Sequence, residues 1–264
     1  MNTLIAINGA CGRMGHRLIA MAKDDPQLSI AAAIDAAGNP CIGRDAGELA
    51  AVGPIGVKVS TDLSLDTRVD VVVDFSTPDG TMTALKTCVT RRIPIVIATT
   101  GHTPQQKREI EAAAHETAVL HAPNMSLVVN VLFKLTQMAA NLLKGHGYDV
   151  EIIERHHRFK KDSPSGTALH FAKIIQDIQG QAILKHGREG IVGERPSDEI
   201  GLHSVRAGDN VGEHTIIFST LGETMELVHK GHSRDAYARG ALQAAKFLAG
   251  RPAGRYSMSD VLGL

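Results

Sequence analysis

The sequence predicts an α/β protein with a Rossmann-type parallel-sheet domain, followed by a second α+β domain with a mixed or antiparallel sheet. In the first half of the chain, short apolar runs alternate with amphipathic helical stretches, as they do in βαβ units. In the second half, three strand-like segments follow one another without intervening helices. A chain of 264 residues with 43% hydrophobic residues is large enough for two domains, each with its own core.

The N-terminal segment has the three parts of a dinucleotide-binding unit. Residues 4–8 are an apolar run that indicates a buried strand, and residues 9–15 have the spacing G-x-x-G-x-x-G before an amphipathic stretch. Residues 29–34 indicate a second strand, which ends at Asp35, 20 residues after Gly15. In such units the glycine turn lets a pyrophosphate approach a helix N-terminus, and the acidic residue bonds the ribose. The alternative interpretation is a tight strand-to-helix turn next to an exposed Asp.

Further strand and helix signals continue the alternation. We expect strands at 69–75, 93–99 and 118–121, and helices at 76–92 and 103–117. Because parallel strands are joined by right-handed crossovers, the loops after the strands should line one edge of the sheet, where ligands bind. These loops are the glycine turn, the Asp35 loop, Ser76-Thr77, Thr99-Thr100 and Ala122-Pro123-Asn124-Met125.

The pattern changes after about residue 126. A helix is expected at 127–144, strands at 149–153, 203–208, 214–221 and 225–230, a polar loop at 185–201, and a helix at 233–249 with Ser233 as its cap and Gly250 as its stop. We therefore predict a dinucleotide-binding domain over residues 1–126, with 238–264 packing back on it. Residues 127–237 would form a domain for substrate binding and oligomerisation.

Residues 154–168, with the sequence ERHHRFKKDSPSGTA, concentrate chemically active side chains between a strand and a helix. Ser165 is a good N-cap, and a helix that starts with Ser, Gly and Thr presents amides to an anion such as a carboxylate or phosphate. His156 and His157 change protonation near neutral pH, and Lys160 is a proton donor whose pKa burial can lower. We interpret this segment as a site for proton transfer to an anionic substrate.

Two other interpretations of residues 154–168 are possible. The basic residues and the histidine pair could form an ordinary solvated loop. A metal site fits less well, because adjacent strand residues such as His156 and His157 point to opposite faces of a sheet and could not ligate one ion together. We therefore predict no metal.

The overall composition excludes several classes of partner. Lys plus Arg and Asp plus Glu are equal at 28 each, so no net field favours nucleic acid or an anionic membrane surface. Aromatic residues are only 3%, with no Trp, which leaves little for base stacking. Three widely spaced cysteines argue against a disulfide framework, and the N-terminus lacks the pattern of a signal peptide. We expect a cytoplasmic protein.

Beyond this chemistry, the sequence resembles the bacterial 4-hydroxy-tetrahydrodipicolinate reductases, also called dihydrodipicolinate reductases, over essentially its whole length. The resemblance rests on the glycine loop 9–15, on Ala98-Thr99-Thr100-Gly101 and Ala122-Pro123-Asn124-Met125, and on the signature E-x-H-H-x-x-K-x-D-x-P-S-G-T-A at 154–168. Segments 205–209 and 212–214 are also similar to the family.

The resemblance implies a reaction and a role for each matching residue. Hydride from NADH or NADPH would reduce a cyclic dicarboxylate, with loss of water, in the diaminopimelate route to lysine. His156 would be the general acid/base and Lys160 the proton donor, and a homotetramer would form through the second domain. The substrate carboxylates would be held by His157, Ser165, Gly166 and Thr167. The cofactor would be bound by Gly9, Ala10, Cys11, Gly12, Arg13, Met14, Asp35, Ala98, Thr99, Thr100, Ala122, Pro123, Asn124 and Met125.

Two departures from the family pattern bear on the cofactor. Ala36 stands beside the ribose acid where the family often has Arg, which favours NADH over NADPH, and Cys11 replaces a frequent Gly.

Two other functions remain as alternatives. A thioester-forming aldehyde oxidoreductase needs a nucleophilic Cys in the second domain, yet all three cysteines precede residue 89. A non-catalytic dinucleotide sensor gives no reason for His156, Lys160 and the anion site to occur together.

Overall fold

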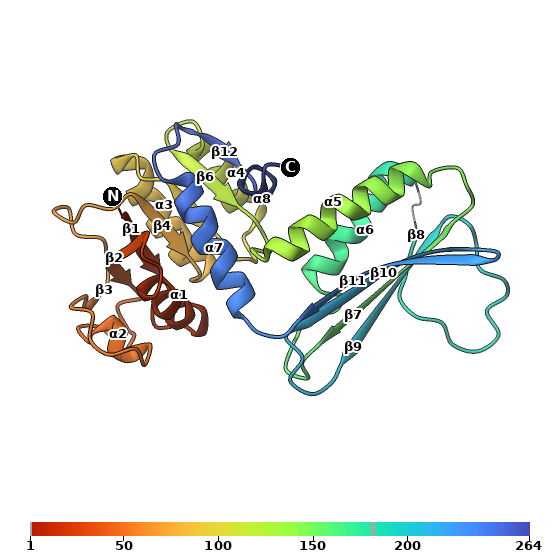
Figure 1. The fold of residues 1–264 in the computed structure, drawn as a ribbon, viewed down its shortest axis with the longest axis horizontal. Coiled ribbons are helices and arrows are strands. Elements are labelled where there is room, and N and C mark those ends of the chain that lie inside the picture. Colours follow the sequence, from red (N-terminus) through yellow and green to blue (C-terminus); the bar gives the residue numbers. More distant parts are fainter. Residues whose placement is uncertain (1, 181–182) are drawn as a thin grey trace. The chain divides into compact units, whose positions relative to one another are not determined.

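The computed structural model describes residues 2–180 and 183–264. By their contacts these residues divide into two compact units, and each is described by itself (Figure 1). Unit 1 runs to Leu127 and resumes at Arg234–Leu264. Unit 2 comprises Val128–Ser233 and is therefore contiguous in the sequence.

Unit 1 is built on a parallel sheet of seven strands in the order β12-β6-β5-β4-β1-β2-β3. The direction of the strand order reverses between β1 and β4, which are hydrogen-bonded neighbours. In such sheets ligands bind beyond the carboxyl ends of the strands at this reversal. The strands are β1 Thr3–Asn8, β2 Leu28–Ile34, β3 Val59–Ser60, β4 Val71–Asp74, β5 Ile95–Ile97, β6 Ala118–His121 and β12 Gly254–Tyr256.

Helices cover both faces of this sheet, as the near-continuous apolar strands require. On one face α1 (Arg13–Lys23) and α7 (Asp235–Leu248) pack on side chains such as Ile5 and Val73. On the other face α3 (Pro78–Arg91) and α4 (Pro104–Ala113) pack on the alternate residues of the same strands. Two short helices, α2 Ala46–Leu49 and α8 Met258–Leu262, complete the unit.

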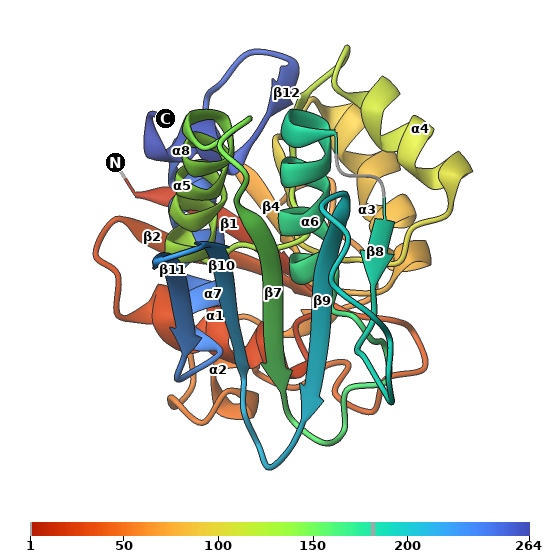
Figure 2. The same cartoon turned by 90° about the vertical axis from the view of Figure 1, so that its right-hand side faces the viewer.

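Unit 2 has a mixed sheet of five strands in the order β11-β10-β7-β9-β8 (Figure 2). The pairs β7–β9 and β8–β9 are parallel, whereas β10 is antiparallel to both β7 and β11. Two helices, α5 and α6, cover one face with a core centred on Phe171 and Phe218. The elements are α5 Leu127–Leu142, β7 Asp149–His156, α6 Gly166–Gln179, β8 Ile183–Lys185, β9 Glu199–Arg206, β10 Gly212–Thr220 and β11 Glu223–Gly231.

The α/β fold class with a parallel and a mixed sheet is confirmed, but several boundaries differ from the expectation. Strand β7 continues to His156 rather than ending at residue 153, because its pairing with β9 extends to His156 and Glu154 bonds His156 and Arg206 within the sheet. Helix α7 begins at Asp235 with Arg234 as its N-cap and no side-chain capping bond, so the predicted cap at Ser233 is wrong. No helix in the described parts of the chain is long and apolar enough to span a bilayer.

Candidate active site

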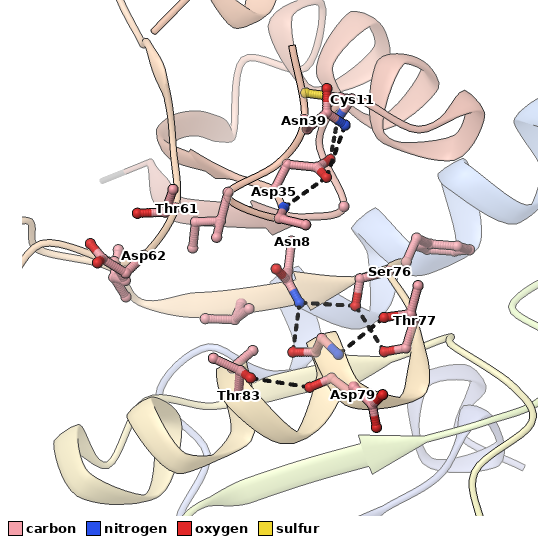
Figure 3. A pocket seen from close by; sticks show the side chains of 18 of the residues that line it. Asn8, Cys11, Asp35, Asn39, Thr61, Asp62, Ser76, Thr77, Asp79 and Thr83 are labelled. Carbon is pink, nitrogen blue, oxygen red and sulfur yellow. Dashed lines mark hydrogen bonds between the residues drawn. The ribbon is translucent and has the colours of Figure 1, made fainter. Parts of the chain in front are cut away.

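A cavity of about 570 Å³ opens in unit 1 at the carboxyl ends of β1 and β4, where the strand order reverses (Figure 3). Its wall carries three carboxylates, those of Asp35, Asp62 and Asp79, and no Lys or Arg is found among its described lining residues. The lining residues are Asn8, Gly9, Cys11, Gly12, Ile34, Asp35, Ala36, Ala37, Asn39, Thr61, Asp62, Leu63, Val72, Phe75, Ser76, Thr77, Asp79, Gly80, Thr83, Ala84, Thr87 and Cys88.

The glycine turn at this cavity leaves no room for side chains at its two ends. Gly9 has a φ of +82°, and a Cβ there would lie 2.4 Å from the carbonyl oxygen of Phe75. A Cβ on Gly15 would lie 2.3 Å from the carbonyl oxygen of Gly9. Both glycines are therefore required by the close approach of β1, α1 and the loop after β4.

Asp35 organises the other side of the glycine turn. Its carboxylate accepts hydrogen bonds from the Cys11 amide at 2.8 Å and from Asn39 Nδ2 at 3.1 Å, and Figure 3 shows it pointing toward both residues. Asn39 Oδ1 in turn accepts from the Cys41 amide. Burial, a hydrogen bond with Cys41 and the charge of Asp35 raise the pKa of the Cys11 thiol to about 12, so Cys11 is neutral at physiological pH.

A fully buried carboxylate, Asp74 at the end of β4, ties together the loops beside the cavity. It accepts from Asn8 Nδ2 at 2.7 Å, Ser76 Oγ at 2.5 Å, Thr81 Oγ1 at 2.6 Å and Thr99 Oγ1 at 2.8 Å. Thr99 Oγ1 also accepts from the Ser76 amide. The ends of β1, β4 and β5 and the first turn of α3 are thereby joined through one residue.

The structure places the predicted cofactor residues in three groups. Gly9, Cys11, Gly12 and Asp35 line the cavity, whereas Ala10 is buried beneath it and Arg13 and Met14 form the first turn of α1. Ala98, Thr99 and Thr100 follow β5, and Ala122, Pro123, Asn124 and Met125 follow β6, so both groups belong to the carboxyl edge of the sheet. Sequence reasoning missed the α3 side chains Thr83, Ala84 and Thr87, because a helix face beside a ligand has the same pattern as one beside a core.

Two histidines of unit 1 lie side by side. His102 is in the segment after β5, and His121 is the last residue of β6. The rings of His102 and His121 form a T-shaped, edge-to-face pair, with an interplanar angle of 89° and their centroids 5.2 Å apart. Burial, together with the charge that His102 would carry, lowers the pKa of His121 to about 4, and burial also lowers the pKa of His102. Both rings are therefore neutral near pH 7 and cannot supply a cation to this edge of unit 1.

Unit 2 holds the signature segment around another buried carboxylate, that of Glu154. Glu154 is 0% exposed and accepts two hydrogen bonds of 2.7 Å from the guanidinium of Arg206. It also accepts from His156 Nδ1 at 2.6 Å and from the Ser165 amide at 3.0 Å. Burial raises the pKa of this carboxyl, but the hydrogen bonds from His156 and Arg206 outweigh burial and hold the pKa well below its usual range.

A third histidine, His214 on β10, packs against His156 with the ring centroids 5.4 Å apart. His214 Nε2 lies 3.3 Å from Ser165 Oγ, which also accepts from the Ala168 amide as the N-cap of α6. Burial and the neighbouring His156 charge lower the pKa of His214 to about 3, so its ring is neutral. Sequence reasoning assigned no role to His214, Glu154 or Arg206. The available signal was a charged residue, Glu154, on the inward face of an apolar strand.

The remaining predicted residues surround this cluster. Lys160 is half-buried and lies 2.9 Å from Asp162, which it holds with a pKa below the usual range against the effect of burial. The His157 amide donates to the Asn210 carbonyl, which fixes the turn after β7 to the turn before β10. At the start of α6, Gly166 is exposed, and a Cβ added there would meet no atom within 4 Å. Thr167 follows in the same first turn.

The arrangement brings titratable side chains and a helix N-terminus together within unit 2. His156, Ser165 and the first turn of α6 are joined through Glu154, and Lys160 lies in the loop between His156 and Ser165. A helix N-terminus attracts anions through its unpaired amides and its dipole. The site can therefore hold a carboxylate close to groups that donate or accept a proton.

Comparison with known proteins identifies the family. Residues 3–125 match the model for the N-terminus of dihydrodipicolinate reductase, and residues 128–262 match the model for its C-terminus. The chain is 46% identical to 4-hydroxy-tetrahydrodipicolinate reductase of Syntrophotalea carbinolica and 43% identical to that of Anaeromyxobacter dehalogenans. These alignments cover 98% and 99% of this chain, respectively, and 98% of each relative.

A solved structure, dipicolinate-bound dihydrodipicolinate reductase from Paenisporosarcina sp. TG-14, has the same fold, with a TM-score of 0.76 and 24% identity. The match covers 97% of this chain and 98% of that one. The family models together span almost the whole chain, and the curated relatives agree with them over nearly full length. The chain therefore belongs to the dihydrodipicolinate reductase family.

Proposed function

We propose that this protein reduces 4-hydroxy-tetrahydrodipicolinate to tetrahydrodipicolinate in the diaminopimelate route to lysine. One hydride and one proton enter the substrate, and the ring hydroxyl leaves as water. The proposal is supported by relatives that carry this name at 42% to 46% identity over nearly full length. One structural observation carries the proposal: the carboxylate of Glu154 is hydrogen-bonded both to His156 and to the Ser165 amide at the N-terminus of α6.

Each residue that the sequence predicted for the unit 2 site has a role in this proposal. The first turn of α6, with Ser165, Gly166 and Thr167, holds a substrate carboxylate through its amides and hydroxyls. His156 serves as general acid/base, and Lys160 donates the proton that accompanies reduction. His157 completes the recognition of the second carboxylate. Open space at Gly166 lets a ligand come close to the helix backbone.

Unit 1 is the proposed site of the nicotinamide cofactor, which supplies the hydride when bound. The cavity at the strand reversal fits the adenosine half of a dinucleotide, because Gly9 and Gly15 leave the turn bare and Asp35 stands at its wall. The loops after β5 and β6, with Thr99 and Asn124, would hold the nicotinamide half.

NADH is the favoured cofactor in this proposal. A 2′-phosphate on the adenosine ribose would face the carboxylate of Asp35, with Ala36 beside it in place of a guanidinium. The other charged lining residues, Asp62 and Asp79, are also acidic. Unit charges about 4 Å apart at an effective dielectric near 20 interact by roughly 4 kcal/mol, so repulsion outweighs any gain from the added phosphate. Arg13, in the first turn of α1, is the cation whose movement would permit use of NADPH.

A homotetramer assembled through unit 2 is also proposed. In the described part of unit 2, no helix covers the face of the sheet opposite α5 and α6, and this face carries partly exposed apolar residues such as Val205 and Val228. Sheet faces of this kind are buried by a second copy in oligomers. Light scattering on the purified protein measures the number of chains directly, and a monomeric mass would remove this part of the proposal.

The reaction itself is tested by mixing the purified protein with freshly generated product of the preceding synthase and following the absorbance of NADH or NADPH. We expect oxidation of the cofactor that depends on both protein and substrate. Pyridine-2,6-dicarboxylate, which is planar and has two carboxylates, should inhibit competitively against the substrate. A protein that binds NADH but leaves it unoxidised with this substrate would favour the sensor alternative.

A further inference from the structure

We infer that Glu154 is the positioning residue of the site: its carboxylate sets which nitrogen of His156 carries the proton, and it fixes His156 relative to the substrate-carboxylate site at α6. The inference rests on the proposed function for the meaning of that site. It assigns to Glu154 a role that acts through two other residues. Glu154 itself need not touch the substrate.

Each carboxylate oxygen of Glu154 binds a different part of the site. Oε2 accepts from His156 Nδ1 at 2.6 Å, and Oε1 accepts from the Ser165 amide at 3.0 Å. Arg206 donates to both oxygens, at 2.7 Å each, so donors from three residues converge with good geometry on one fully buried carboxylate, and Ser204 adds a further side-chain hydrogen bond. Such a carboxylate is held rigidly, because each oxygen is bonded from two directions.

The bond to Oε2 determines the protonation of His156. An ionised carboxylate can only accept, so His156 Nδ1 must donate and keeps its proton in the neutral ring. The other nitrogen, Nε2, is then the one that accepts and releases a proton. This is the arrangement in which a buried carboxylate orients a catalytic imidazole and stabilises its protonated form.

Other charged groups around the ring modify this effect but do not replace it. Arg206 is the register partner of His156 on β9, and Lys160 lies in the loop after β7. Both carry a positive charge and therefore disfavour protonation of the His156 ring. His214, from β10, is neutral because burial and the charge of His156 lower its pKa to about 3. Glu154 is thus the anion in direct contact with His156, and the exposed carboxylate of Asp162 is engaged by Lys160.

The bond to Oε1 couples the proton site to the anion site. Ser165 is the N-cap of α6, so its amide marks the start of the helix that receives the substrate carboxylate. Because the Glu154 carboxylate binds both this amide and His156, the Glu154 side chain fixes the distance between His156 and the site for the substrate carboxylate. A fixed separation of this kind lowers the entropy cost of reaching the reactive geometry.

The wild-type protein provides the first test without any change at Glu154. In ¹⁵N-histidine-labelled protein above the pH at which His156 titrates, NMR should show the neutral ring protonated at Nδ1 and bare at Nε2. His156→Asn identifies the signal. A ring protonated at Nε2 would overturn the inference whether or not the protein is active.

Glu154→Gln provides the second test, with Glu151→Gln as its matched control. Both residues are ion-paired glutamates on β7, but Glu151 lies on the opposite face of the sheet. We expect Glu154→Gln to lose the single tautomer, to lower kcat by about 100-fold or more, and to move the acid limb of the pH–rate profile by about one pH unit to lower pH. The Glu151→Gln variant should keep the wild-type tautomer and profile.

These outcomes separate the inference from the proposed function. Failure of the wild type to reduce the substrate, with the Nδ1-protonated ring observed, would remove the proposed function and leave the positioning role of Glu154. An active wild type whose tautomer and pH profile are unchanged in Glu154→Gln would remove the positioning role alone. If Glu154→Gln does not fold, the wild-type tautomer decides the matter.

Discussion

The carboxylate of Glu151 lies directly over the Cα of Gly201, its register partner on β9: a Cβ added to Gly201 would be 1.7 Å from Glu151 Oε2. Two arginines from the loop after β8 hold the carboxylate in this place. Arg188 donates to Oε1 at 2.9 Å and Arg195 to the same oxygen at 3.0 Å, while His203 Nε2 lies 2.6 Å from Oε2. Gly201 is therefore required by an ion-pair cluster, which also attaches a long loop to the sheet.

This cluster should make unit 2 sensitive to acid. Burial raises the pKa of Glu151, but the bonds from Arg188, His203 and Arg195 outweigh it and lower the pKa from 4.5 to about 2. A depressed carboxyl pKa contributes stability that is present above pH 4.5 and is lost as pH falls toward 2. The difference corresponds to at most on the order of 3 kcal/mol. Urea unfolding at several pH values should show a shallower loss between pH 5 and pH 3 in Glu151→Gln than in the wild type.

The matched control for this measurement is Glu226→Gln. Glu226 is an exposed residue of β11. It lies on the same face of the unit 2 sheet as Glu151, because both are register partners of Ile217. Its replacement should leave the pH dependence of unfolding as in the wild type. Equal slopes for all three proteins would mean that the Glu151 cluster does not stabilise the fold.

His156→Ala and Lys160→Ala should each lower kcat while leaving NADH affinity nearly constant. In the proposed mechanism both residues act on the proton that moves with the hydride, and general acid/base catalysis contributes about 10²–10⁴-fold to the rate. Steady-state rates with the authentic substrate measure kcat, and NADH fluorescence measures cofactor binding. Lys161→Ala removes a neighbouring exposed Lys and is the control that should retain activity. A near wild-type kcat in either test variant would show that its residue has another role.

Gly166→Ala should separate folding from substrate binding. The added methyl group meets no atom within 4 Å, and the position lies at the start of α6, so thermal stability should be unchanged or slightly higher. The same methyl group would stand where the substrate carboxylate approaches the helix, so KM should rise while NADH affinity stays constant. Loss of stability with an unchanged KM would assign this glycine to the fold instead of the substrate.

Thr167→Val should raise KM for a different reason. The substitution keeps the shape of the side chain but removes the hydroxyl at the proposed anion site, and a hydrogen bond to a charged group contributes roughly 1.5–3 kcal/mol. Competitive inhibition by pyridine-2,6-dicarboxylate should weaken in parallel. Weaker NADH binding with an unchanged KM would place this loop in the cofactor pocket.

Cofactor choice is tested by kcat/KM for NADH and NADPH in the wild type, Ala36→Arg and Arg13→Ala. We expect the wild type to favour NADH, or at least not to discriminate strongly against it, because Asp35 and Ala36 offer a 2′-phosphate no cation. Ala36→Arg should shift the ratio toward NADPH, and Arg13→Ala should remove whatever NADPH activity remains. A strong wild-type preference for NADPH that persists in Arg13→Ala would contradict the argument.

The fold class and family could be predicted from sequence because their signals are local. Apolar runs of strand length, the glycine spacing at 9–15 and the signature at 154–168 each lie within one short segment. The short strands β3, β8 and β12 carry no such periodicity, since two or three residues are too few to show alternation. They form because longer strands beside them offer an unpaired edge.

The centre of the unit 2 site could not be predicted in the same way. His156 and Ser165 were recognisable from their chemistry, but Glu154 joins them to Arg206, and Ser165 contacts His214. These two partners lie about 50 and 60 residues after Glu154, on β9 and β10. These partners depend on strand register, and a shift of one residue would turn Glu154 to the other face of the sheet. A single sequence contains no direct record of that register.

Unit 1 cannot be completed until α7 and β12 have left the ribosome. Helix α7 supplies Ala241 and Leu248 to the core that covers Ile5 and Val73, and β12 pairs with β6 only after residue 254 has been made. Unit 2, by contrast, is contiguous and can fold as soon as its own residues have emerged. During synthesis, one face of the unit 1 sheet therefore stays uncovered while unit 2 forms. In that interval the apolar residues of this face are exposed to aggregation and to chaperones.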